Sequence, residues 1–109
     1  MNDTYVISDH KGMFAISLND ILWIKADGSC TVFFCKNNQK HTDSKHLKMV
    51  LLKFDASRFV KTHKSYVVNI REVKFYERGR SGTLIMSDGT SLPVAESRKE
   101  YFLKRFRGL

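Results

Sequence analysis

The sequence has no long apolar run, only two cysteines and a single proline, and each shortage removes a class of protein. Without about 18 consecutive apolar residues, no segment is expected to cross a membrane as a helix. Residues 1–4 lack the basic and then apolar pattern of a signal peptide, so we expect a cytoplasmic protein with no membrane partner. The single proline, Pro93, falls late in a series of short strands, which suits an edge strand.

The two cysteines do not form a metal-binding or disulfide pattern. Cys30 and Cys35 lie in one segment that reads as extended, and their odd spacing sends the side chains to opposite faces of a sheet. A bridge between them would need distorted geometry, and zinc sites prefer closely paired ligands. We therefore expect two reduced thiols, no metal and no cofactor.

The motifs of common enzyme classes are missing as well. The chain has no Gly-x-x-x-x-Gly-Lys phosphate loop, no Gly-x-Gly-x-x-Gly turn and no His-Glu-x-x-His zinc motif. His63 with Cys30 or Cys35 could supply a base and a thiol nucleophile, but nothing local supports that pairing. The sequence predicts no enzyme and no small-molecule substrate.

Positive charge is what the sequence has in excess. Lys and Arg number 19 against 11 Asp and Glu, for a net charge of +8, and residues 36–80 alone hold 12 of the former against 4 of the latter. Such a concentration suits a surface that faces a polyanion, and nucleic acid is the partner it favours. A merely solvated basic face explains the charge equally well, and an acidic membrane surface explains it less well.

The order of elements predicts one mostly β domain over residues 1–109, with a core large enough to fold without metals or disulfides. Short apolar segments separated by turn residues predict strands, and Asp27-Gly28 is a strong signal for a tight hairpin turn. Two helices interrupt the strands. The strands are expected at 5–7, 13–16, 21–26, 30–35, 40–42, 59–61, 66–68, 73–76, 83–86 and 91–94.

Each predicted helix has a candidate start. Ser44 suits the cap of an internal helix that turns Leu47, Val50, Leu51 and Phe54 inward and Lys45, Lys48 and Lys53 outward. Ser97 and Glu100 have the spacing of a capping box at the start of the C-terminal helix. In the strands, Trp23 and Tyr66 are expected in the core.

Three segments together resemble the LytTR (LytR/AgrA-type) DNA-binding domain of bacterial response regulators. They are residues 18–28 (LNDILWIKADG), 59–69 (FVKTHKSYVVN) and 84–94 (LIMSDGTSLPV), and the second is the most specific. The resemblance covers about residues 13–107, and these residues contain no receiver domain. It implies small packed antiparallel sheets with one internal helix and a C-terminal helix.

The resemblance also implies a function. Members of this family regulate transcription as output domains of two-component systems, binding promoter direct repeats in double-stranded DNA with loops in the major groove, which brings a second copy onto the DNA. The family's contact positions fall at three places in this chain and beside its internal helix. They map to Ser29 and Thr31, to His63, Lys64 and Ser65, to Ser97, Arg98 and Lys99, and to Lys48 near the phosphate backbone.

The chain departs from the family pattern at two of these places. Lys64 stands where arginine is commoner, which favours a phosphate contact over a two-bond contact with guanine. Ala95-Glu96 replaces the usual Ser-Arg, so we expect Arg98 or Lys99 to supply the contact near the last helix.

Structural roles compete with DNA contact at several positions. His63 and Ser65 could equally well hold their own turn, and Lys48 could be only solvated. Asn69 is a further candidate DNA contact, but it is expected to satisfy backbone groups at a turn rather than to read a base. Two other functions also remain open. The first is a basic β domain that binds RNA or single strands through outward aromatics of the pairs Phe33-Phe34 and Phe75-Tyr76. The second is a protein-interaction or small-ligand module.

Overall fold

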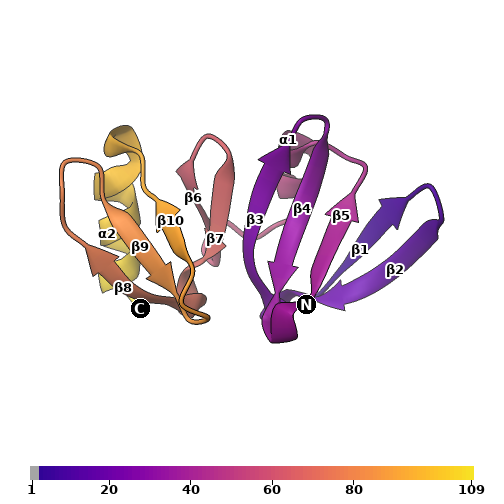
Figure 1. Cartoon of the computed structure of the whole chain (residues 1–109), viewed down its shortest axis with the longest axis horizontal. Coiled ribbons are helices and arrows are strands. Elements are labelled where there is room, and N and C mark those ends of the chain that lie inside the picture. The colour runs from indigo at the N-terminus through magenta and orange to yellow at the C-terminus, as the bar shows by residue number, and fades with distance from the viewer. Residues whose placement is uncertain (1–2) are drawn as a thin grey trace. The chain divides into compact units, whose positions relative to one another are not determined.

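The computed structural model describes residues 3–109, and the chain divides into two compact units, Met1–Phe54 and Asp55–Leu109. Both are built mainly of short antiparallel strands, and each contains one α-helix, as Figure 1 shows. The mostly β fold predicted from the sequence is confirmed. Within the described residues, no helix is both long enough and apolar enough to span a bilayer.

The first unit contains two antiparallel strand groups and a short helix. Strand β1 pairs with β2, and β4 lies between β3 and β5. The bounds are β1 Thr4–Asp9, β2 Gly12–Ser17, β3 Ile21–Asp27, β4 Cys30–Cys35, β5 Lys40–Asp43 and α1 Leu47–Leu51.

Aromatic side chains fill much of the core of the first unit. The Tyr5 ring lies 5.3 Å from Phe33 and 5.0 Å from Phe54, centre to centre, and Phe33 is fully buried. Trp23 is buried, as predicted, and stacks on Phe34 at 4.6 Å. The Tyr5 hydroxyl donates a hydrogen bond of 2.8 Å to Asp43 Oδ2, and burial raises the pKa of this phenol, so it stays protonated at neutral pH.

The internal helix begins later than predicted. Its cap is His46, whose Nδ1 accepts a bond from the Met49 backbone N–H, and the helix ends after a turn and a half at Leu51. Ser44 does not cap it, because its hydroxyl and its N–H both donate to the Ser8 carbonyl on β1. The predicted apolar face is still used, since Leu47 and Val50 are buried.

Both cysteines are free thiols, and the buried one gives the fold a pH dependence. Burial, with a smaller effect of the Asp20 charge, raises the pKa of Cys35 to about 11. A raised thiol pKa stabilises the fold below the unfolded value of about 9, and that stabilisation is lost as the pH rises toward 11.

We therefore expect the free energy of unfolding of the native chain to fall between pH 9 and 11 by roughly 2 kcal/mol more than that of Cys35→Ala. Urea unfolding at several pH values, with reductant present, measures this difference. Comparing the two chains cancels the lysines and tyrosines that titrate in both. Parallel stability curves would show that the thiol is not protected by burial.

The second unit contains a hairpin, a three-stranded antiparallel group and the longer helix. Strand β6 pairs with β7, and β9 lies between β8 and β10, so Pro93 is on an edge strand as predicted. The bounds are β6 Phe59–His63, β7 Tyr66–Asn69, β8 Val73–Glu77, β9 Thr83–Met86, β10 Ser91–Pro93 and α2 Lys99–Arg107.

Two expectations for the second unit are wrong. Ser97 and Glu100 do not form a capping box, because Ser97 lies inside a 3₁₀ turn, Glu96–Arg98, that leads directly into α2. Arg98 is the residue before the helix, and it makes no side-chain cap. Tyr66 is only half-buried rather than in the core, with its ring 5.6 Å from that of His63 beside the exposed β6–β7 turn.

Candidate nucleic-acid interface

The positive charge is divided unequally between the two units. Residues 1–54 contain seven Lys and Arg against five Asp and Glu, a net charge of +2, whereas residues 55–109 contain twelve against six, a net charge of +6. Sequence counting placed the excess in residues 36–80, but the fold assigns that stretch to both units. The second unit therefore has the stronger attraction for a polyanion.

The β6–β7 turn of the second unit is shaped by a β-bulge. The strand register shifts between Lys61 and His63, so Thr62 is fully buried while His63 pairs with Tyr66 across the turn. Bulges of this kind redirect side chains. The His63 Nδ1 accepts a hydrogen bond of 3.1 Å from the Ser65 N–H, which leaves Nε2 as the donor of the neutral ring. Lys64 at the tip of the turn is exposed.

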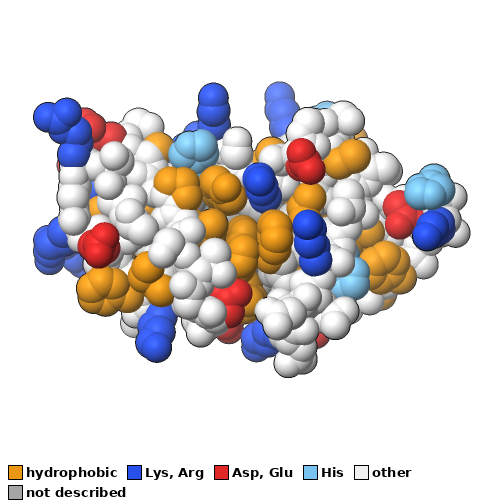
Figure 2. All heavy atoms as spheres, viewed as in Figure 1, with side chains coloured by type: hydrophobic (Ala, Val, Ile, Leu, Met, Phe, Trp, Pro, Cys, Tyr) orange, Lys and Arg blue, Asp and Glu red, His pale blue; other side chains and the backbone are white. Residues whose placement is uncertain are grey.

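A backbone hydrogen bond joins this turn to the segment before α2. The Ala95 N–H donates to the Thr62 carbonyl at 2.8 Å, so residues far apart in the sequence become neighbours. Glu96 and Ser97 are exposed there, and Arg98 is half-buried. In Figure 1 the β6–β7 turn and the start of α2 lie at the same end of the second unit, and Figure 2 shows Lys or Arg and His side chains exposed at that turn.

Lys99 has a role that the sequence did not indicate. Its ammonium group donates to the carbonyls of Gly79 at 3.1 Å and Arg80 at 3.4 Å, which holds the β8–β9 loop against the start of α2. The β8–β9 loop, which carries the exposed residues Arg78 and Arg80, is therefore held beside the start of α2. Only the density of Arg and Gly in residues 78–82 could have suggested this loop.

In the first unit, the β3–β4 turn exposes one predicted contact and the fold buries the other. Gly28 has a φ of +60, a conformation that glycine adopts without strain, and Ser29 beside it is exposed. Thr31 is fully buried, and its hydroxyl donates a 2.8 Å bond to the Lys45 carbonyl. This hydroxyl is used within the fold, so we remove Thr31 from the candidate interface.

The Thr31 bond also positions the internal helix. It ties Lys45, just before α1, to strand β4 close to the β3–β4 turn. Figure 1 shows α1 and the β3–β4 turn at one end of the first unit. Lys48 is exposed on α1, so a phosphate could reach its ammonium group.

Asn69 has the structural role that its turn position suggested. It is 1% exposed, and its Oδ1 accepts a bond of 3.2 Å from the Arg71 N–H at the start of the 3₁₀ turn after β7. An amide that is buried and bonded in this way is not available to a base, so Asn69 too leaves the candidate interface.

Residues 3–109 contain no group of three or more His, Cys, Asp or Glu side chains that could hold a metal ion. Besides the carboxylates of Asp27 and Glu96, the polar side chains at the two ends described above are hydroxyls, an imidazole, ammonium groups and guanidinium groups. These are donors suited to phosphate and to base edges.

Comparison with known proteins also points to a DNA-binding domain. The family model described as the LytTr DNA-binding domain matches residues 11–107. A solved structure with 19% sequence identity, the LytTr DNA-binding domain of a Bacillus cereus protein assigned as a methyl-accepting/DNA response regulator, has the same fold with a TM-score of 0.81. That match covers 96% of this chain and 97% of the other. No match to a curated protein was found. Since the family model spans nearly the whole chain, this protein belongs to the LytTr DNA-binding domain family.

Proposed function

We propose that this domain binds double-stranded promoter DNA sequence-specifically at direct repeats, with a second copy on the adjacent repeat. It regulates transcription without catalysis, as the cytoplasmic output domain of a two-component system. The observation that carries the proposal is the Thr62–Ala95 hydrogen bond, because it assembles two of the family's contact loops on the unit with a net charge of +6.

In this proposal the exposed and half-buried side chains divide into those that position the DNA and those that read it. Lys64, as a point charge, and the hydroxyls of Ser65 and Ser97 bind phosphate. Arg98 and His63 reach base edges in the major groove. Glu96 repels phosphate, so this loop contributes less affinity than a Ser-Arg loop would.

In the first unit, Ser29 and Lys48 have the corresponding roles. Ser29 stands at the tip of the β3–β4 turn, where a hydroxyl can donate to or accept from a base, and Lys48 binds the backbone. Lys99 acts indirectly, by holding the loop that carries Arg78 and Arg80. Those two arginines are added to the phosphate-binding set.

Selection from random duplex oligonucleotides with the purified chain tests the whole proposal. Recovery of two copies of one motif at a constant spacing supports it. Recovery of one unrepeated motif would refute binding of a second copy of the domain to an adjacent repeat. The absence of any enriched motif would refute sequence-specific binding. A parallel selection uses single-stranded oligonucleotides. If the chain bound these more tightly than the selected duplex, single-strand binding would replace duplex binding as its function.

Replacing His63 by asparagine separates its two roles. The asparagine oxygen can accept the Ser65 N–H as the imidazole Nδ1 does, so the turn should persist while the ring donor is lost. We expect an unchanged melting temperature and a roughly fivefold loss of affinity for the selected duplex, the value of one modest hydrogen bond. Fluorescence anisotropy measures the affinity. An unchanged affinity would show that His63 only stabilises the β6–β7 turn and does not contact DNA.

Alanine replacements of Lys48 and Arg98 should affect the affinity for selected and random duplexes differently. Lys48→Ala is expected to weaken selected and random duplexes alike, because a phosphate contact carries no sequence information. Arg98→Ala is expected to weaken the selected duplex by about tenfold and the random one much less, since a base contact is worth roughly 1–3 kcal/mol. Binding of both duplexes to both variants measures this. Equal losses for Arg98→Ala would assign it to phosphate.

A further inference from the structure

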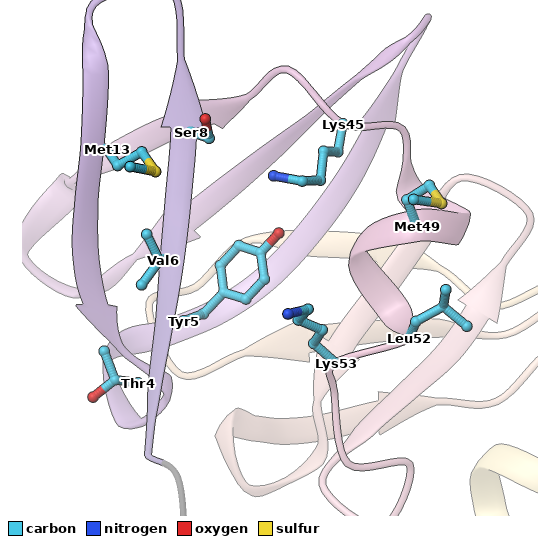
Figure 3. Close-up of a pocket in the computed structure, with 9 residues that line it drawn as sticks. All are labelled: Thr4, Tyr5, Val6, Ser8, Met13, Lys45, Met49, Leu52 and Lys53. Carbon is cyan, nitrogen blue, oxygen red and sulfur yellow. The ribbon is translucent and has the colours of Figure 1, made fainter.

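A pocket of about 360 Å³ lies in the first unit between the β1–β2 hairpin and α1, away from the β3–β4 turn in sequence and built from other residues. Cavities of this size suit small organic ligands. The hairpin contributes one wall and the helix with its flanking residues the other. The lining residues, drawn in Figure 3, are Thr4, Tyr5, Val6, Ser8, Met13, Lys45, Met49, Leu52 and Lys53.

The two walls are unusually apolar for an exposed surface. Val6 is 50% exposed, Met13 75%, Met49 48% and Leu52 76%, and these are four of the eight large apolar side chains that are exposed among the described residues. Val6 and Met13 come from the paired strands of the hairpin, and Met49 and Leu52 come from α1 and its end. Apolar side chains that gather at one hollow mark a binding site. Two are methionines, which adapt their shape to a ligand.

Two lysines give this apolar hollow a positive end. In Figure 3 the side chains of Lys45 and Lys53 extend from the helix side toward the ring of Tyr5. The lining contains no acidic residue. The nearby carboxylate of Asp43 is fully buried, accepts bonds from the Tyr5 hydroxyl and the Lys45 N–H, and lies 3.8 Å from the Lys45 ammonium group. Two ammonium groups against one carboxylate leave a single positive charge to be matched.

We propose that this pocket binds a small amphipathic monocarboxylate, with its carboxylate between Lys45 and Lys53 and its apolar tail against Val6, Met13, Met49 and Leu52. The single uncompensated charge selects a monoanion, and the apolar walls select a ligand with a hydrocarbon or aromatic body. Nucleic acid uses the charge but not the walls, because its phosphates carry no apolar tail. None of the lining residues is one of the proposed DNA contacts, although Met49 is next to Lys48 on α1.

Titration of the isotope-labelled chain with decanoate, below its micelle concentration and without DNA, tests this proposal by NMR. We expect saturable shifts centred on Val6, Met13, Met49 and Leu52. Acetate tests the need for the tail and decylammonium the need for the negative charge, and both should bind at least tenfold more weakly. Equal binding of decylammonium, shifts centred elsewhere or no saturation would overturn the proposal.

Charge and tail variants complete the test. Lys45→Gln with Lys53→Gln should weaken decanoate by about tenfold or more, and Leu52→Ser by roughly threefold, whereas the matched control Lys74→Gln on β8 should leave it unchanged. All four replaced side chains are exposed, so the variants are expected to fold, and circular dichroism checks this. An unchanged affinity in the lysine pair would overturn the proposal. Concentration-dependent broadening of the same signals without ligand would assign the surface to a second copy instead, and would also overturn it.

Discussion

Phe102→Ala is expected to lower the free energy of unfolding by about 3–5 kcal/mol, the range for loss of a fully buried phenylalanine. Phe102 is 0% exposed and is the buried residue of α2. Its ring lies 5.6 Å from that of Tyr76 on β8 and 5.5 Å from that of Phe106 one turn along the helix. The alanine variant leaves a cavity where α2 is anchored to the strands.

The matched control is Tyr101→Ala on the same helix. Tyr101 is 51% exposed, and its loss should cost under about 1 kcal/mol, since exposed positions contribute little. Urea unfolding followed by circular dichroism measures both variants. Because domains have total stabilities of about 5–15 kcal/mol, a loss of this size removes a large share of the stability, and the urea midpoint of Phe102→Ala should lie well below that of the native chain. Similar losses for the two variants would show that α2 is not held by its buried ring.

The affinity for duplex DNA is expected to fall steeply with salt. If five to nine phosphates are neutralised, the slope of log affinity against log salt is about −4 to −8, since each phosphate contributes about −0.9. Between about 50 and 200 mM salt the affinity should then fall by about 10² to 10⁵. The exposed Lys48, Lys64, Arg78 and Arg80 are the groups from which we expect the counterion release to come.

Anisotropy titrations at four salt concentrations measure this slope. Lys64→Gln should make the slope less negative by about one, as the loss of one phosphate contact predicts. The control, Lys74→Gln, removes an equal charge from a strand position outside the candidate contacts and should leave the slope unchanged. A slope near zero would rule out binding through phosphates. Equal changes in the two variants would indicate diffuse attraction without a defined contact.

Local sequence determined most of the fold. The Asp27-Gly28 hairpin follows from turn chemistry, and the edge position of Pro93 follows from the missing N–H of proline. The predicted helix starts failed because short-range rules do not include distant partners. Ser44 donates to a β1 carbonyl instead of capping a helix. The segment before α2 is held by the hydrogen bond from the Ala95 N–H to the Thr62 carbonyl on β6, and Ser97 does not cap the helix.

The resemblance in the sequence identified the family and its contact segments, but only the tertiary structure decided which of those side chains are available. Thr31 and Asn69 have suitable donors, yet their burial and their bonds to the backbone remove them. Arg78 and Arg80 join the surface through the hydrogen bonds of Lys99, about twenty residues away. A residue's type and spacing set the chemistry it could perform. Solvent access and long-range hydrogen bonds decided whether it is free to do so.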